Sequence, residues 1–212
     1  MGIPVIVIGA GGHAKVLIDA LLTIGIEVLG ATDMDPVRLD SSICGLRVLG
    51  DDNILVRYAP QAVRLVNGLG SVAVTTARQR IYEKYKGLGY SFETIIHPSA
   101  VVSKDVELSE GVQVMAGAII QAGSQIGQNT IINTGATVDH DCEIGAHVHL
   151  APGAILSGSV KVGSGTHIGT GAVVIQNIRV GHNDIIGAGS VVVENIADCR
   201  KVIGVPAREW SS

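Results

Sequence analysis

Residues 120–138 read IQAGSQIGQNTIINTGATV, and a branched aliphatic residue stands at every sixth position of this stretch. The same step of six continues without a gap in both directions, from Ile96 to Val192. An α-helix repeats its apolar positions about every 3.6 residues and a β-strand about every 2, so neither element explains the spacing. A step of six is typical of a parallel β-helix built from hexapeptides. We therefore predict such a coil over this stretch.

The predicted coil has three sides, and one aliphatic side chain of each hexapeptide points to its axis. Residues three repeats apart then stack at the separation of neighbouring strands, about 4.8 Å. One such ladder contains Ile96, Val114, Ile132, Leu150, Ile168 and Ile186. The axis side chains alone are too few to offset the conformational entropy that the ordered backbone loses. We therefore expect the coil to bury further surface against other copies of the chain.

The composition of the 212-residue chain excludes several classes of partner. Hydrophobic residues make up 47% but aromatic residues only 3%, which suits a thin coil better than an aromatic-filled globule. The net charge of -4 gives no basic surface for nucleic acid or an anionic membrane. No segment has the apolar length that spans a bilayer and the N-terminus has no secretion signal, so we expect a cytoplasmic location. Cys44, Cys142 and Cys199 are widely spaced, and we expect them to be reduced.

A different pattern, of alternating strands and helices, lies ahead of the coil. Strands are expected at residues 4–8, 26–32, 63–66 and 72–74, and helices at residues 14–24 and 78–86. The buried face of the first helix is expected to contain Val16, Leu17, Ala20, Leu21 and Ile24. The sequence therefore predicts an α/β domain over residues 1–94, followed by the coil and a short tail over residues 95–212.

The turn after the first strand has the sequence of a nucleotide-binding loop. Gly9, Gly11 and Ala14 match the pattern G-x-G-x-x-A, and the acidic Asp33 follows about twenty residues later. Glycines let backbone amides approach an anion, and the N-terminus of the following helix attracts phosphate. The domain is half the size of a full dinucleotide-binding domain, so a mononucleotide suits it better than NAD. A purely structural glycine turn is the alternative.

Four of the seven histidines fall within a short part of the coil: His140, His147, His149 and His167. His140 lies at a predicted corner between two aspartates, where a carboxylate can hold the imidazole in one tautomer and raise its basicity. His149 precedes an axis residue and should point away from the coil, half a turn from His140. The two could cooperate only across a subunit interface. We expect His147 and His167 to be surface residues, and the ligand spacing of a metal site is absent.

The hexapeptide run, the turn from Gly9 to Lys15 and the closing segment from Gly204 to Arg208 together resemble a family of bacterial acyltransferases. In these enzymes a small Rossmann-like nucleotide-sugar-binding domain precedes a left-handed β-helix. Within the family, the chain is similar to nucleotide-aminosugar N-acetyltransferases of the bacillosamine and perosamine type, and to the sialic acid O-acetyltransferases. The resemblance implies a homotrimer that uses acetyl-CoA, with active sites between subunits and no metal.

The resemblance also implies roles for individual residues. His140 would be the general base and Asp141 its partner. Residues matched to the nucleotide-sugar site are Gly9, Gly11, Gly12, His13, Asp33, Asp35, Asn133 and His149. Residues matched to acetyl-CoA binding are His149, Gly158, Gly204, Pro206, Ala207 and Arg208.

The reaction that the resemblance implies is acetylation of the 4-amino group of a nucleotide-linked 4-amino-4,6-dideoxy sugar, for bacterial surface-glycan biosynthesis. O-acetylation of a sugar such as sialic acid is the main alternative. A non-catalytic nucleotide-binding trimer and an NAD-dependent oxidoreductase are further alternatives. The sugar, the base (UDP or GDP), the pathway and any movement between the domains are left open by the sequence.

Overall fold

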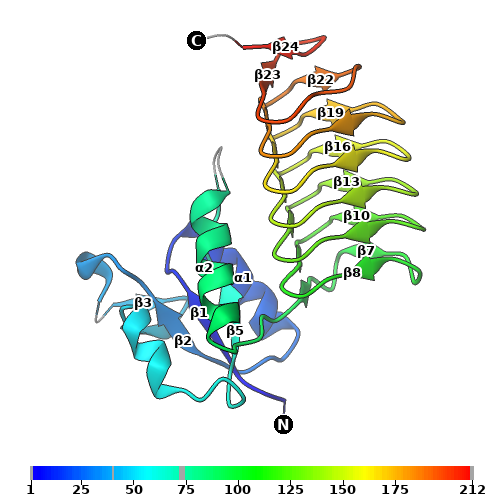
Figure 1. The fold of residues 1–212 in the computed structure, drawn as a ribbon. Coiled ribbons are helices and arrows are strands. Elements are labelled where there is room, and N and C mark those ends of the chain that lie inside the picture. Colours follow the sequence, from blue (N-terminus) through cyan, green and yellow to red (C-terminus); the bar gives the residue numbers. More distant parts are fainter. Residues whose placement is uncertain (1, 40, 72–74, 211–212) are drawn as a thin grey trace.

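The computed structural model describes residues 2–39, 41–71 and 75–210, and it divides into an α/β part and a long three-sided coil (Figure 1). The α/β part has a five-stranded sheet with the order β3-β4-β2-β1-β5. Its strands are β1 (Val5–Ile8), β2 (Val28–Thr32), β3 (Ser42–Ile43), β4 (Leu46–Gly50) and β5 (Arg64–Asn67). Its helices are α1 (Gly12–Thr23) and α2 (Thr76–Gly87), with short 3-10 turns η1 (Pro36–Arg38) and η2 (Asp52–Arg57). The predicted helix at residues 78–86 is confirmed, whereas the strand predicted at residues 72–74 lies outside the described residues.

Helix α1 begins at Gly12 and not at Ala14, and its buried face differs from the predicted one. The residues that it buries are Ala14, Leu17, Ile18, Ala20 and Leu21. The prediction was wrong for Val16 and Ile24, which are both exposed. Val16 lines a cavity described below, and Ile24 is the C-cap, beyond the last turn that packs on the sheet.

The coil consists of two-residue strands arranged on three faces, which we name after their first strands. The β6 face contains β6 (Ile95–Ile96), β9 (Gln113–Val114), β12 (Ile131–Ile132), β15 (His149–Leu150), β18 (His167–Ile168), β21 (Ile185–Ile186), β23 (Lys201–Ile203) and β24 (Arg208–Glu209). The β7 face contains β7 (Val101–Val102), β10 (Ile119–Ile120), β13 (Thr137–Val138), β16 (Ile155–Leu156), β19 (Val173–Val174) and β22 (Val191–Val192). The β8 face contains β8 (Glu107–Leu108), β11 (Gln125–Ile126), β14 (Glu143–Ile144), β17 (Lys161–Val162) and β20 (Arg179–Val180).

The register of the coil confirms the predicted stacking. Ile132 pairs with Leu150, and Leu150 pairs with Ile168, all in parallel strands. The axis residues from Val114 to Val192 are buried, whereas those of the first turn are only partly covered. A second inward series, two positions ahead of each axis residue, was not predicted; it contains small and aliphatic residues together with Thr166 and the acidic Asp184. Polar members of this series accept backbone hydrogen bonds from the next turn, as when Thr166 Oγ1 accepts from the Asp184 amide at 3.0 Å.

Two different physical reasons explain why certain positions in the coil are glycine. Gly135 has a φ of +64° at a corner, a conformation that costs glycine little. Gly127 has no such angle, but a Cβ there would lie 2.5 Å from the backbone of Gly145 in the next turn. Close approach of neighbouring turns therefore requires glycine there.

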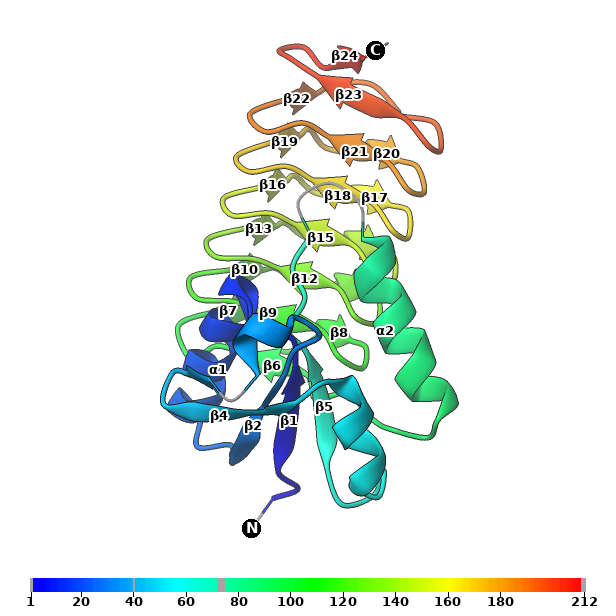
Figure 2. The same cartoon turned by 90° about the vertical axis from the view of Figure 1, so that its left-hand side faces the viewer.

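The α/β part packs against the β6 face at the start of the coil, and α2 lies alongside it (Figures 1 and 2). Arg78 of α2 is buried and donates to the carbonyl oxygens of Asn67, Leu69 and Asn129, so it ties the sheet to a corner of the coil. Burial lowers the pKa of Arg78 to about 9. Within the described part of the chain, no helix is long and apolar enough to cross a bilayer. The division into domains at residues 94 and 95 stays a prediction.

Candidate active site

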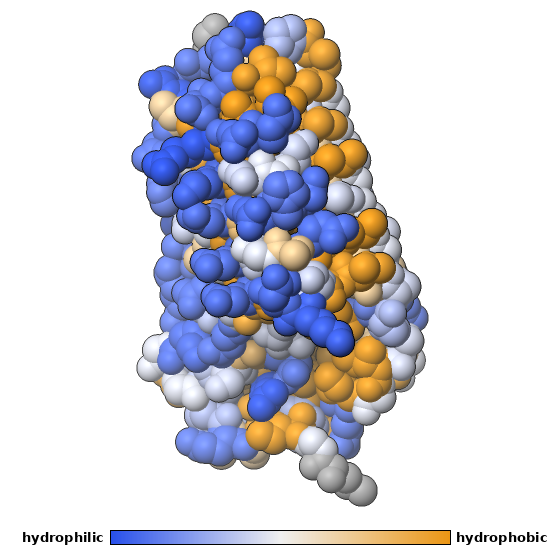
Figure 3. All heavy atoms as spheres, turned by 90° about the vertical axis from the view of Figure 1, so that its right-hand side faces the viewer, coloured by the Kyte–Doolittle hydropathy of each residue, from blue (hydrophilic) through white to orange (hydrophobic). Residues whose placement is uncertain are grey.

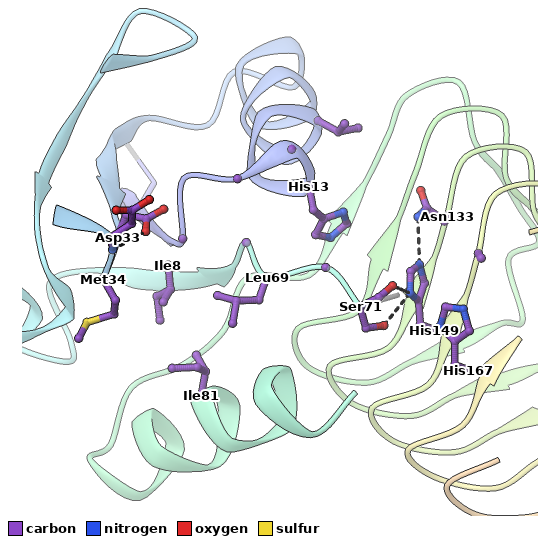
Figure 4. Close-up of a pocket in the computed structure, with 18 of the residues that line it drawn as sticks. Ile8, His13, Asp33, Met34, Leu69, Ser71, Ile81, Asn133, His149 and His167 are labelled. Atoms are coloured by element: carbon purple, nitrogen blue, oxygen red, sulfur yellow. Dashed lines mark hydrogen bonds between the residues drawn. The ribbon is translucent and has the colours of Figure 1, made fainter. Parts of the chain in front are cut away.

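A cavity of about 970 Å³ lies where the α/β part meets the β6 face (Figure 4). Its wall is formed by the β1–α1 turn, the end of β2, residues 68–71 and the coil turns that carry Asn133 and His149. The structure brings together all the residues that were matched to a nucleotide-sugar site. These are Gly9, Gly11, Gly12, His13, Asp33, Asp35, Asn133 and His149.

One end of the cavity is formed by the glycine turn and the N-terminus of α1. Gly11 is the N-cap, Gly12 is exposed, and nothing lies within 4 Å of where a Cβ would stand on either residue, so a ligand can approach the first turn of α1. Asp33 fixes this turn, since its Oδ2 accepts from the amide of Ala10 at 2.8 Å. Arg38 also lines the cavity and donates to the carbonyl oxygen of Ala10. This end can therefore receive a phosphate group.

His13 is held from the coil side by Gln113. The His13 Nε2 lies 2.8 Å from Gln113 Oε1, and the amide nitrogen of Gln113 donates to the carbonyl oxygen of Asn67 at 2.9 Å. Because the Gln113 amide is oriented by Asn67, His13 donates from Nε2 and keeps a lone pair on Nδ1. Burial lowers the pKa of His13 to about 4, so the imidazole is neutral at physiological pH.

His149 uses both of its ring nitrogens within the protein. Its Nε2 accepts from Asn133 Nδ2 at 3.0 Å, and its Nδ1 lies 3.1 Å from the carbonyl oxygen and 2.8 Å from the hydroxyl of Ser71 (Figure 4). As predicted, the side chain points away from the coil axis. Ser71 packs against it, and burial lowers its pKa to about 3. His149 is therefore a neutral wall residue and not a base in this arrangement.

The prediction that His147 and His167 lie at the surface was wrong. His147 is buried where α2 covers the coil, with Nδ1 2.9 Å from the Asn129 amide nitrogen and its ring edge against Tyr82. His167 is buried in the cavity wall, edge-on to His149. Sequence reasoning missed both because the covering elements are distant in the chain. The step of six did hold a signal for His167, since it follows His149 by three repeats and so shares its face.

His140 and Asp141 form an exposed pair on the coil. The His140 Nδ1 lies 2.8 Å from Asp141 Oδ2, and the two side chains are 60% and 67% exposed. This hydrogen bond, followed by the charge of Asp139, raises the pKa of His140 above its ordinary value. Because Nδ1 is used by Asp141, the Nε2 lone pair is available to take a proton. The two side chains therefore form the contact that their sequence positions suggest, and their catalytic role stays a prediction.

Gly158 lies directly beyond His140, one turn further along the coil. A Cβ at Gly158 would lie 2.5 Å from His140 Nε2, and the Ser159 amide donates to the His140 carbonyl oxygen at 2.9 Å. The structure thus brings His140, Asp141 and Gly158 together at the corner between the β7 and β8 faces. None of them is among the residues that line the cavity.

The closing segment folds over the far end of the coil. Gly204 has a φ of +98°, the Val205–Pro206 peptide bond is cis, and the Ala207 amide donates to Val191. Arg208 Nη2 lies 3.7 Å from Glu194 Oε1. Glu194 occupies the same repeat position as His140, at the same corner near the end of the coil. One column of corner positions therefore leads from His140 past Gly158 to Arg208.

Comparisons with known proteins agree with this arrangement. Residues 4–85 match the family model of the PglD N-terminal domain, and residues 123–158 match that of the bacterial transferase hexapeptide with six repeats. A comparison with curated proteins found no match.

Solved structures give matches over the whole chain. A variant of perosamine N-acetyltransferase from Caulobacter crescentus, in complex with CoA and GDP-perosamine, is 44% identical, with 99% of this chain and 97% of that chain covered and a TM-score of 0.92. The acetyltransferase domain of PglB from Neisseria gonorrhoeae FA1090, in complex with acetyl coenzyme A, is 37% identical, with 99% and 100% covered and a TM-score of 0.91. WeeI from Acinetobacter baumannii AYE shares the fold at 23% identity, with 98% and 99% covered and a TM-score of 0.88.

These matches confirm the predicted fold class, a small α/β domain joined to a left-handed parallel β-helix. The alignment with the perosamine enzyme covers nearly all of both chains, so it spans the α/β part and the coil. The chain belongs to the hexapeptide-repeat sugar N-acetyltransferases that carry an N-terminal domain of the PglD type.

Proposed function

We propose that this protein transfers the acetyl group of acetyl-CoA to the 4-amino group of a nucleotide-linked 4-amino-4,6-dideoxy sugar, in bacterial surface-glycan biosynthesis. The observation that carries this proposal is the full-length similarity to an N-acetyltransferase solved with CoA and GDP-perosamine. The nucleotide diphosphate would bind over Gly9, Gly11 and Gly12, with His13, Asp33 and Asp35 beside it. The sugar would extend toward Asn133 and His149 at the coil.

Chemistry requires a base near the attacking amine and a donor near the thioester oxygen. His140 would accept the amine proton on Nε2 as the nitrogen attacks the thioester carbonyl, and Asp141 would hold the imidazole in the correct tautomer. The Gly158 amide, which has no acceptor among the described residues, would donate to the developing oxyanion. The carbon–sulfur bond then breaks, and the protonated His140 returns its proton to the CoA thiolate. An N-acetyl sugar nucleotide and CoA are the products.

Acetyl-CoA is elongated, and we propose that it lies along the corner column that begins at His140. The thioester would sit beside His140 and Gly158, with His149 of a neighbouring copy close by. The far part of CoA would reach the closing segment, where Gly204, Pro206 and Ala207 shape the wall. Arg208 offers a charged group for a phosphate there.

We propose a homotrimer with each active site shared between two copies. Support comes from the β7 face, whose outward residues are mostly aliphatic and are exposed or half-buried in one copy: Val101, Ile119, Ile155, Val173 and Val191. Val101 and Ile155 are 61% and 42% exposed. Outward residues of the β8 face are polar, and Figure 3 shows the apolar column beside that polar surface. A second copy on the β7 face would bring a cavity close to the His140 corner.

We also propose a cytoplasmic location, because acetyl-CoA and nucleotide sugars are made there. Cys44, Cys142 and Cys199 are all free thiols, as expected in a reducing compartment.

The direct test is thiol release from acetyl-CoA by the purified protein. GDP- and UDP-linked 4-amino-4,6-dideoxy sugars serve as acceptors, with free sialic acid as the comparison. We expect turnover with a nucleotide-linked amine, and the preferred base follows from the same assay. Turnover with sialic acid alone, giving an alkali-labile ester, would contradict the proposal and identify an O-acetyltransferase.

A further inference from the structure

One histidine in the cavity wall has no hydrogen-bond partner on either ring nitrogen among the described residues. His167 lines the cavity and is only 6% exposed, yet its Nδ1 is buried without a hydrogen-bond partner among the described residues. Its Nε2 has no hydrogen-bond partner among those residues either. Buried polar groups in folded proteins are nearly always hydrogen-bonded, so an unpaired imidazole in a cavity wall indicates that a ligand supplies the partner.

The neighbouring polar groups are already paired within the protein. His149 is bonded on both nitrogens by Asn133 and Ser71, and Asn133 Oδ1 accepts from the Thr134 amide at 2.8 Å. These residues shape the wall but retain little capacity for a ligand. Of His149 and His167 at the coil end of the cavity, it is therefore His167 whose ring can form a new hydrogen bond with a ligand.

Packing against His149 fixes the orientation of the His167 ring. It pairs with His149 in adjacent parallel strands, and the two rings meet edge to face with centroids 5.0 Å apart (Figure 4). A buried unpaired N–H is rarer than a buried unpaired lone pair, so the proton belongs on Nε2 and not on the enclosed Nδ1. Burial lowers the pKa of His167, which keeps the ring neutral. His167 is therefore a neutral hydrogen-bond donor.

This step rests on the proposed function: the place of His167 in the cavity indicates which atoms of the bound sugar it would contact. The glycine turn and Asp33 form the opposite, phosphate-binding end of the cavity. In a pyranose linked through C1, the ring carbon farthest from the diphosphate is C4, which carries the amine. Its two neighbours are C3 and C5, and in a 6-deoxy sugar C5 carries a methyl group, so the hydroxyl next to the amine is the one on C3. We propose that His167 is a specificity-determining residue that donates a hydrogen bond from Nε2 to the C3 hydroxyl oxygen.

The test compares a nucleotide-linked 4-amino sugar with its 3-deoxy and 2-deoxy analogues in wild type and in His167→Phe. Phenylalanine keeps the ring against His149 and removes both nitrogens. We expect the wild type to favour the parent over the 3-deoxy analogue by about ten-fold in kcat/KM, a ratio typical of one hydrogen bond. In His167→Phe this ratio should fall to about two or less, with turnover of the 3-deoxy analogue unchanged.

The matched control is His182→Phe, the same exchange at an exposed coil corner outside the cavity, which should keep the wild-type ratio. Equal losses on parent and 3-deoxy analogue in His167→Phe would indicate a structural role and overturn the inference. An unchanged ratio would overturn it too, as would loss of discrimination at C2 in place of C3. Absence of turnover by the wild type with every nucleotide-linked amine is a different result, since it contradicts the proposed function itself.

Discussion

In the proposed mechanism the chemistry depends on His140, and the environment of this residue predicts a pH dependence. The hydrogen bond to Asp141 raises the pKa of His140, and only the unprotonated imidazole can accept a proton from the amine. Activity should therefore rise with pH through this raised pKa.

Replacing Asp141 with asparagine tests the origin of that pH dependence. Without the carboxylate the pKa of His140 falls, so the acid limb of kcat/KM should move to lower pH while the maximum rate drops. Asp139→Asn should move the limb in the same direction but less, because Asp139 is the smaller cause. A pH–rate profile of the three proteins measures this. If the acid limb of the Asp141→Asn profile stays at the wild-type pH, a group other than His140 controls the pH dependence.

Gly158 is a second residue whose replacement separates activity from stability. A Cβ at this position would lie 2.5 Å from His140 Nε2, and the exposed imidazole can swing away. Gly158→Ala should therefore reduce kcat by at least about ten-fold, because a displaced base transfers protons poorly. The midpoint of urea unfolding should barely change.

Gly127→Ala is the matched control for that exchange. Its Cβ would meet the backbone of Gly145 at 2.5 Å, and backbone cannot move aside as a side chain can. It should destabilise the protein by about 1–3 kcal/mol. Equal unfolding midpoints for the two variants would contradict this account of the coil glycines.

At the scale of the coil, one inward position carries an unexpected carboxyl group. Asp184 Oδ1 accepts from the Arg200 amide at 2.7 Å, but Oδ2 is buried without a partner among the described residues. Burial raises the pKa of Asp184 above its ordinary value of 3.8. The folded state therefore favours the protonated acid, and stability should fall as the pH rises from about 4 through the raised pKa.

Asp184→Asn removes this titration. Between about pH 4 and about pH 7.5 the free energy of unfolding should fall less in the variant than in the wild type, because no charge has to form inside the coil. Chemical unfolding at several pH values measures the difference. Parallel stability curves for the two proteins would show that Asp184 is ionised at no cost.

The coil was the most predictable element, since the step of six alone indicated its ladders and the exposed corner of His140. The six-residue period cannot reveal what covers a face of the coil, so the burial of His147 beside α2 and of His167 in the cavity wall was missed. The same limit explains Val16 and Ile24 in α1. Motif matching brought the cavity residues together correctly, but only the structure revealed that Asn133 and His149 bind each other.

At the scale of the whole molecule, the account depends on contact between copies. Ile155→Glu places a charge in the apolar column of the β7 face, so it should convert the proposed trimer to monomers and abolish most activity. Gln125→Glu adds a charge on the polar β8 face and should leave both mass and activity unchanged. Sedimentation analysis gives the mass. An active Ile155→Glu trimer would show that the β7 face is not the interface.

The central claim is that His140 of one copy serves the cavity of another. Two inactive variants test it: His140→Ala, expected to lose about 10²- to 10⁴-fold in rate, and Gly12→Trp, whose side chain enters open space at the cavity mouth.

The variants are unfolded together in equal amounts, refolded into mixed trimers and assayed for CoA release. A shared site then combines an intact His140 with an intact cavity in about a quarter of cases, so about a quarter of wild-type activity should return. If each chain held a complete site of its own, no mixture would recover activity, and that result would contradict the account.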